Sequence, residues 1–224
     1  YSTAGPTEIK NGTQTITSEG QSAYDGVREV AIFTKRVRIS DPPTFLEADS
    51  LEYSQATHFA QAFGNVFFED TAEHISIVCE QADYNDSTSY FFAVGRPLMT
   101  TLIENDTLYL AADTLKSYYE DPTDTTTRMI IADVDVRVYK SDLQAVCDSL
   151  MYSDADSLFQ FFKDPIIWSD TSQFSSDTVR ITLANETIDK IYLFNNAFII
   201  NSPDEVFFNQ IKAFKSTFRL CLFK

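Results

Sequence analysis

Residues 48–66 read ADSLEYSQATHFAQAFGNV, and this stretch contains one complete step of a repeat. A small residue and an acid come first, then Tyr53, then a turn-forming segment and a strand that ends at the break Gly64-Asn65. The first residue after the break, Val66, lies 13 positions after Tyr53. Strand, turn, strand, break and strand in this order are typical of β-hairpin structure.

The same spacing recurs along the chain. Four further pairs are 13 positions apart and a sixth pair is stretched to 17: Tyr24 and Val37, Tyr84 and Pro97, Tyr152 and Pro165, Ala184 and Ala197, and the stretched pair Tyr119 and Val136. A repeat of about 30 residues indicates an architecture built by stacking one supersecondary unit on the next.

The repeat unit is predicted to consist of strands. Val, Ile, Phe, Tyr and Thr are dense between the turn signals, which favours strands over paired helices. Residues 143–151 instead suggest a helix, because their apolar residues fall at helical spacing after Asp142. However, Cys147-Asp148 occupies the position that Ala48-Asp49 and Ala112-Asp113 fill in other repeats, where no helical spacing exists. The segment is therefore predicted to be a strand, and the chain an all-β protein.

Composition and charge limit the possible classes of function. The chain has 17 basic and 33 acidic side chains, a net charge of −16, which repels nucleic acids and anionic membrane surfaces. No apolar run approaches the length that spans a bilayer. We expect a loosely ordered, polar lead-in over residues 1–19, a single continuous domain over residues 20–212, and an atypical C-terminal strand or tail over residues 213–224.

Residues with catalytic or metal-binding chemistry are scarce or periodic. The two histidines, His58 and His74, have no ligand-type residues at metal-binding spacing, and no glycine-rich loop could hold a phosphate. The acids that precede the tyrosines recur with the structural period: Asp49, Glu80, Asp113 and Asp148. A catalytic pair needs only one or two positions, whereas a role in stabilising turns or strand ends predicts this recurrence. The sequence thus predicts neither an enzyme nor a bound cofactor or metal.

Two apolar stripes remain as the candidate site. Their residues occupy matched positions before each tyrosine and after each break: Leu46, Ala48, Val66, Phe68, Ile77, Leu110, Ala112, Val134, Val136, Ile166 and Phe198. The stripes either close into a dry core or leave a groove for a long apolar ligand. A bulge near Asp49 or its equivalents would reverse the face that points inward, so both orientations stay open.

Three sequence features resemble the OstA/LptA family of lipopolysaccharide-transport proteins, and the OstA-like proteins of Bacteroidetes-type bacteria in particular. They are the recurring Ala-Asp-Ser/Thr-Leu before a tyrosine, the step at 63–66 into an apolar strand, and the segment 163–168. Together they extend the resemblance over roughly residues 20–210. The acidic excess and the segment 213–224 depart from the family pattern.

The resemblance implies a fold and a function. The fold would be an elongated, twisted β-jelly roll, a half-open barrel of stacked antiparallel strands. Its apolar groove would shield the acyl chains of lipopolysaccharide, or lipid A, during transport to the outer membrane. The implied location is the periplasm, with outer-membrane association and a signal peptide removed ahead of Tyr1, and the implied partners are other such β-jelly rolls, or copies of this chain, joined end to end through strand edges.

Two other readings stay open. A structural or adhesive β-repeat protein would have a filled core between the stripes. A polysaccharide-acting β-helix enzyme would need parallel coils and at least two acids exposed in one cleft.

Overall fold

The chain folds almost entirely into antiparallel strands. The computed structural model describes residues 1–103, 106–169, 171–184, 187–202 and 209–213. Within these ranges the one helix is a 3₁₀ turn, η1 (Thr125–Thr127), and no helix is long and apolar enough to cross a membrane. Adjacent strands pair antiparallel throughout, which confirms the predicted all-β fold of stacked antiparallel repeats.

The strands fall into two compact units. Unit 1 comprises Tyr1–Thr101 and Thr114–Tyr118, and unit 2 comprises Leu102–Asp113 and Tyr119–Lys224. Each unit consists of two facing layers of strands, which we call wall A and wall B. That residues 20–212 form a single domain stays a prediction.

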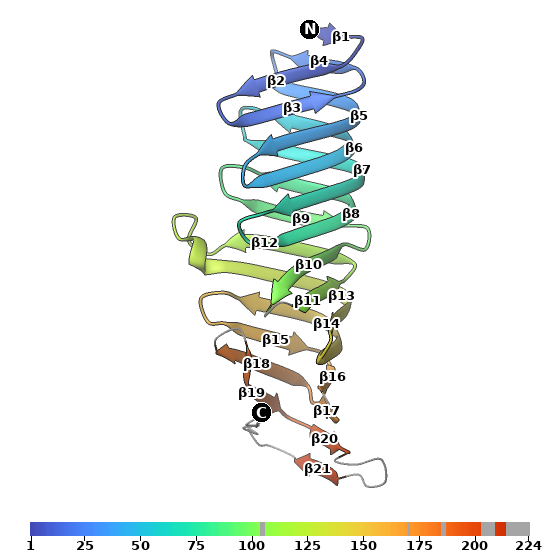
Figure 1. Ribbon diagram of the computed structural model, residues 1–224, viewed down its shortest axis with the longest axis vertical. Coiled ribbons are helices and arrows are strands. Elements are labelled where there is room, and N and C mark those ends of the chain that lie inside the picture. The colour runs from blue at the N-terminus through green and yellow to red at the C-terminus, as the bar shows by residue number, and fades with distance from the viewer. Residues whose placement is uncertain (104–105, 170, 185–186, 203–208, 214–224) are drawn as a thin grey trace. The chain divides into compact units, whose positions relative to one another are not determined.

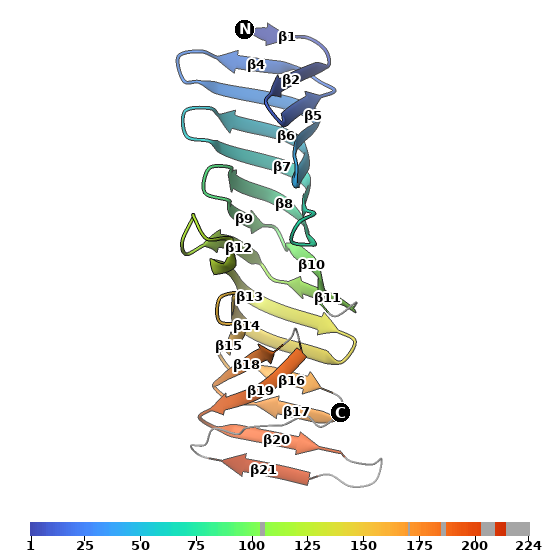
Figure 2. The ribbon, with the colours of Figure 1, turned by 60° about the vertical axis from the view of Figure 1, so that its left-hand side comes forward.

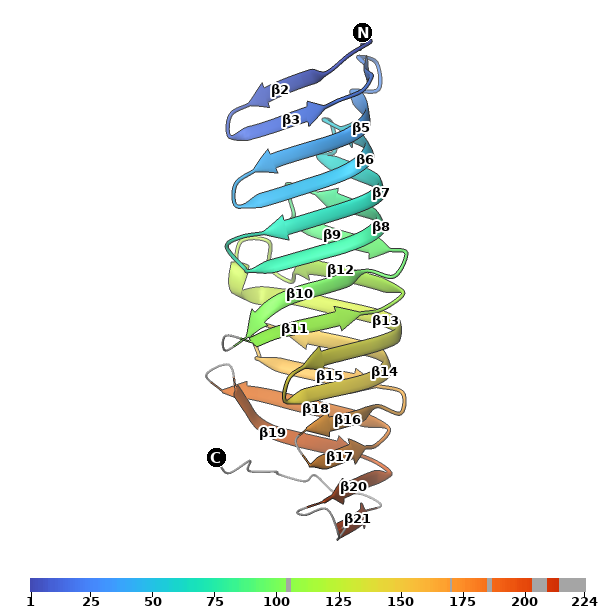
Figure 3. The same ribbon diagram turned by 45° about the vertical axis from the view of Figure 1, so that its right-hand side comes forward.

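Four long strands organise unit 1: β5 (Val30–Asp41), β6 (Thr44–Ser54), β7 (Phe59–Asp70) and β8 (Ile75–Asn85). Each passes from one wall to the other, and the pairing register shifts at this point between β5 and β6, β6 and β7, and β7 and β8 (Figure 1). Short strands complete wall A: β1 (Ser2–Thr3), β4 (Ser22–Asp25), β9 (Tyr90–Val94) and β12 (Thr114–Tyr119). Wall B is completed by β2 (Thr7–Asn11), β3 (Gln14–Ser18) and β10 (Leu98–Ile103), and Figure 3 shows β2, β3 and β5 to β8 side by side.

Unit 2 repeats this plan with two long strands, β13 (Arg128–Lys140) and β14 (Leu143–Ser153), which pass through both walls. Wall A continues with β15 (Leu158–Phe162), β18 (Thr178–Ala184) and β19 (Thr187–Phe194). Wall B contains β11 (Asp106–Ala111), β16 (Ile166–Ser169), β17 (Ser172–Ser175), β20 (Ala197–Asn201) and β21 (Asn209–Ala213), of which the last four are orange to red in Figure 2.

The bend between the walls is a pair of consecutive residues with positive φ, which we call a corner. There are six corners in the described residues: Lys35-Arg36, Gly64-Asn65, Gly95-Arg96, Val134-Asp135, Lys163-Asp164 and Asn195-Asn196. The next residue is buried after every corner. The stride of 13 therefore measures one hairpin turn and one wall A strand, ending where the chain enters wall B.

The recurring acids brace these corners. The Asn65 side-chain amide donates a 2.8 Å hydrogen bond to Asp49 Oδ2, and Lys163 forms an ion pair with Asp148. At a third corner the Asn196 amide donates to Asp177 Oδ1 at 2.9 Å. Two of the four recurring acids, Asp49 and Asp148, thus contact the bends of neighbouring strands through their side chains, as the interpretation of a strand-end role requires, and Asp177 makes the same contact outside that set.

The segment 1–19 differs from the loosely ordered lead-in that the sequence predicts. β2 pairs with β3, and β3 pairs with the wall B part of β5. Ile16 is 5% exposed and Ser18 is 3% exposed, so β3 alternates between an inner and an outer face despite its polar composition. At the other end, β21 includes Ala213, and residues 214–224 of the predicted tail lie outside the described residues.

Candidate functional site

Eight of the eleven predicted stripe residues face the interior between the walls. Each is at most 9% exposed: Leu46, Ala48, Val66, Phe68, Ile77, Leu110, Ala112 and Val136. Leu46 pairs with Phe68, and Phe68 pairs with Ile77, so residues directly opposite each other share the inner face. All eleven predicted positions belong to wall B or to the corners at its edge, so the two predicted stripes alternate from strand to strand on one inner surface and do not face each other across the interior.

The inward orientation is wrong for the other three residues. Val134 is 49% exposed because it belongs to a corner, where the bulge moves its side chain off the inner face. Ile166 pairs with exposed Val146 on the outer face. Phe198 likewise pairs with Ser175, which is on the outer face. The buried neighbours Val136, Ile167 and Ile199 take the inner positions in these strands.

The two walls contact each other inside unit 1. The ring of Phe68 in wall B lies 4.6 Å from that of Phe91 in wall A and 5.8 Å from that of Tyr84, measured between centroids. Phe68 is 8% exposed and Phe91 is 2% exposed. The interior of this unit is thus filled largely by its own side chains.

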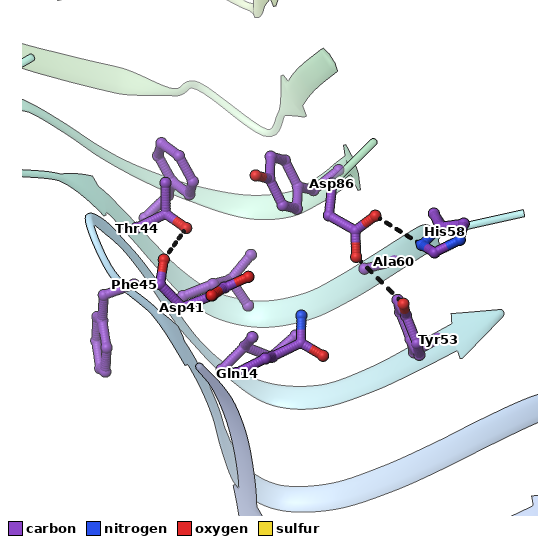
Figure 4. Close-up of a pocket in the computed structure, with 12 residues that line it drawn as sticks. Gln14, Asp41, Thr44, Phe45, Tyr53, His58, Ala60 and Asp86 are labelled. Atoms are coloured by element: carbon purple, nitrogen blue, oxygen red, sulfur yellow. Dashed lines mark hydrogen bonds and ion pairs between the residues drawn. The ribbon is translucent and has the colours of Figure 1, made fainter. Parts of the chain in front are cut away.

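A small cavity marks the edge where the interior of unit 1 reaches the surface (Figure 4). It measures about 20 Å³, room for about one water molecule. The apolar part of its lining is formed by Ile39, Phe45, Leu46, Ala60 and Phe68. Asp86 lies at its rim, 3.0 Å from His58 Nδ1, and accepts a 3.1 Å hydrogen bond from the Tyr53 hydroxyl. The cavity therefore has polar side chains at its rim and apolar side chains behind them.

Burial at this edge affects the tyrosine hydroxyls. Desolvation, and then the negative charge of Asp86, raises the pKa of Tyr53 to about 12. Desolvation also raises the pKa of Tyr84 to about 12, although a hydrogen bond with the Thr44 hydroxyl on wall B opposes the shift. Both phenols therefore remain protonated hydrogen-bonding groups at neutral pH.

Unit 2 has a corresponding cavity of about 40 Å³ between its walls. Its lining is mostly apolar and comes from both walls: Ile103, Leu108, Leu143, Phe159, Ile181, Leu183 and Ile188. Lys140, 9% exposed, lies at the rim, where Nζ is 2.8 Å from Asp142 Oδ1 and 3.8 Å from Asp106 Oδ2. Each unit thus has an apolar interior that opens under a rim of polar side chains.

No other chemistry is assembled in the part of the chain that the structure describes. Within those residues no group of three or more His, Cys, Asp or Glu side chains could hold a metal ion. Cys79 is buried, Cys147 is half-buried, and both are free thiols. Burial raises the pKa of each thiol to about 11, which suits small packing residues better than reactive thiols.

Comparisons with known proteins found similarity among solved structures. No family model matches the chain, and no curated protein matches it. The chain is similar to the crystal structure of LptH, the LptA homologous periplasmic component of the lipopolysaccharide transport device from Pseudomonas aeruginosa. The identity is 10%, the TM-score is 0.29, and the alignment covers 75% of this chain and 94% of that chain. At this TM-score the likeness indicates neither the function nor the ligand of this chain.

Proposed function

We propose that this chain is a non-enzymatic lipid-binding protein that shields the acyl chains of lipopolysaccharide between its walls during transport to the outer membrane. The observation that supports this proposal is the apolar interior of each unit, which reaches the surface at a small cavity beneath a polar rim. An amphiphile matches both parts, because its acyl chains require apolar surroundings and its sugar head group requires water. The sequence resemblance to the OstA/LptA family points the same way.

The energetics require the walls to separate when an acyl chain enters. Separation exposes side chains such as Phe68, which is buried and contacts Phe91 of the other wall. An inserted acyl chain covers the same surface again and adds about 0.8 kcal/mol for each methylene that it buries. Because this attraction has no direction, the lipid can move along the interior without breaking specific polar contacts.

Location and partners belong to the same proposal. A protein that carries lipopolysaccharide to the outer membrane works in the periplasm. Among the described residues β2 pairs with β3 alone, so its outer edge has free backbone groups. A strand edge from another β-jelly roll, or from a second copy of this chain, would pair there.

One observation favours a rival function, a structural β-repeat protein with a filled core. The contact of Phe68 with Phe91 leaves little empty space between the walls of unit 1. A filled-core protein would bind no acyl chain at all. Lipid binding therefore separates the two functions.

The test compares lipopolysaccharide with the oligosaccharide that remains after its acyl chains are removed. We expect the purified chain to bind the intact molecule and not the deacylated one, as measured by equilibrium titration. Shortening one bound acyl chain by two methylenes should weaken binding by roughly tenfold, because about 1.6 kcal/mol of burial is lost. Equal affinity for the intact and deacylated molecules would contradict the proposal.

Neighbouring positions on β8 offer matched variants. Ile77 faces the interior and is 2% exposed, whereas Val78 faces outward and is 45% exposed. Ile77→Glu should abolish lipid binding and Val78→Glu should preserve it. If circular dichroism shows that Ile77→Glu does not fold, the dependence on acyl chains still decides the question with the unaltered chain.

A further inference from the structure

One row of side chains crosses the outer face of wall B in unit 2. Tyr109 on β11 pairs with Tyr139 on β13, Tyr139 with Gln144 on β14, and Gln144 with Trp168 on β16. The row continues through Gln173 on β17, which pairs with Trp168. We call these five residues the aromatic–amide row. Because directly paired residues share a face, their side chains lie side by side on one surface.

The row is accessible and ordered by its own contacts. Tyr139 is 53% exposed, Tyr109 is 40% exposed, and Trp168 is 37% exposed. The two tyrosine rings are 6.2 Å apart between centroids, and the Trp168 indole N–H donates a 3.0 Å hydrogen bond to Gln173 Oε1. The indole is therefore held on the surface by a defined partner, and about a third of the residue stays open to solvent.

The repeat does not require large side chains at these positions. The equivalent row in unit 1 runs over β3, β5, β6, β7, β8 and β10 and consists mainly of small hydroxyl residues: Thr15, Ser40, Phe45, Glu69, Ser76 and Thr100. The row on the outer face of wall B thus contains one phenylalanine in unit 1 and three large aromatic residues in unit 2. Packing of the sheet alone does not account for the difference.

We propose that the aromatic–amide row binds an extended, uncharged glycan built from β-linked hexose or N-acetylhexosamine units. The C–H faces of a sugar ring pack on exposed aromatic rings. Its hydroxyls are donors and acceptors at once, which an amide side chain such as that of Gln144 can match with both of its groups. Neighbouring strands are about 4.8 Å apart, close to the length of one sugar unit in an extended chain, so each strand can present one group to one unit.

Charge and polarity favour this occupant over others. The row contains no charged side chain, although the net charge of the protein is −16, so nothing in the row would attract a phosphorylated or sulfated polymer. An apolar partner such as a lipid surface would remove water from the amides of Gln144 and Gln173. It would offer no hydrogen bonds in place of those that the amides make to water, and this loss costs free energy. A neutral sugar polymer satisfies both the rings and the amides.

Trp168 is the only tryptophan of the chain, so its fluorescence reports on this surface directly. We expect chitohexaose or cellohexaose to change the Trp168 emission in a saturable manner, with calorimetry giving the same dissociation constant. Tyr139→Ala, Trp168→Ala and Gln144→Ala should each weaken binding, the two aromatic substitutions by at least tenfold. Phe45→Ala, in the equivalent row of unit 1, is the matched control and should leave the affinity unchanged.

Three results would overturn the glycan proposal. The first is that neither oligosaccharide at millimolar concentration changes the Trp168 emission or gives a calorimetric signal. This result overturns the proposal also if the surface binds a protein or lipid vesicles instead. The second is binding that survives both aromatic substitutions, and the third is binding that Phe45→Ala weakens equally. The row lies outside the interior and the probes carry no acyl chain, so these outcomes do not depend on the proposed lipid-binding function.

Discussion

Replacing Phe33 by alanine should lower the free energy of unfolding by about 3–5 kcal/mol, among the largest effects of any single substitution in unit 1. Phe33 is 1% exposed and lies on the inner face of wall A, paired with Leu51, which is also 1% exposed. Removing the ring leaves a cavity that the two walls can fill only by shifting together, and the corners limit such a shift. Urea unfolding followed by circular dichroism measures the loss.

Phe63→Ala provides the control for this substitution. Phe63 also lies on a wall A strand of unit 1, but it is 39% exposed. The same atoms are removed from a site that is already partly solvated, so the loss should stay near 1 kcal/mol or less. If the two variants lost similar stability, the inner face of wall A would not be a packed core.

Gly95→Ala should cost roughly 2–4 kcal/mol, through backbone strain and steric overlap together. Gly95 has a φ of +81°, and a β-carbon placed there would lie 2.5 Å from Glu80 Cβ. Because Glu80 Cβ is attached directly to the backbone of a neighbouring strand, it cannot move away as the end of a long side chain could. The corner must therefore distort, and the midpoint of urea unfolding should fall accordingly.

A double-mutant cycle separates the two causes of this loss. Glu80→Gly removes the atom with which the new β-carbon collides, so adding it to Gly95→Ala should recover part of the stability relative to the two single variants. Gly26→Ala is the control, since a β-carbon there meets only Tyr24 Cε1 at 3.7 Å. Perfect additivity of Gly95→Ala and Glu80→Gly would show that the collision contributes nothing.

The repeat made most of the fold predictable. The residue spacing indicates strands even at residues 143–151, where local periodicity suggests a helix, and the structure has strand β14 there. Gly64-Asn65, Gly95-Arg96, Lys163-Asp164 and Asn195-Asn196 are visible as breaks in the sequence, and all four are corners. Glycine and asparagine tolerate positive φ, so three of these breaks have a chemical signal, whereas Lys163-Asp164 is recognised only from its place in the repeat.

Two further corners and one end of the fold give no such signal. Lys35-Arg36 and Val134-Asp135 have positive φ without glycine or asparagine, because the flanking strands impose the bend. Val134 therefore looks like part of an apolar strand in sequence, although it is exposed. The segment 7–18 looks disordered because it is polar, yet β3 needs only Ile16 and Ser18 on its inner face.

The candidate sites were predictable to different degrees. The inward-facing residues follow from matched positions in the repeats. What the sequence misses is which of two consecutive residues after a corner faces inward, as Ile166 and Phe198 illustrate. The aromatic–amide row was missed because its members are far apart in sequence and meet only through the strand register. Trp168 and Gln173 are five residues apart, but Tyr109 and Tyr139 are joined only by the pairing of β11 with β13.

The most direct test of the lipid-binding function is a photocrosslinking scan with lipopolysaccharide. A diazirine amino acid is placed in turn at Leu46 and Phe68, which face the interior, and at Phe67 and Val78, which pair with each other and face outward. We predict that lipid A crosslinks to positions 46 and 68 at least ten times more efficiently than to positions 67 and 78. Equal yields at all four positions, or crosslinks at the outer positions alone, would contradict acyl-chain binding between the walls.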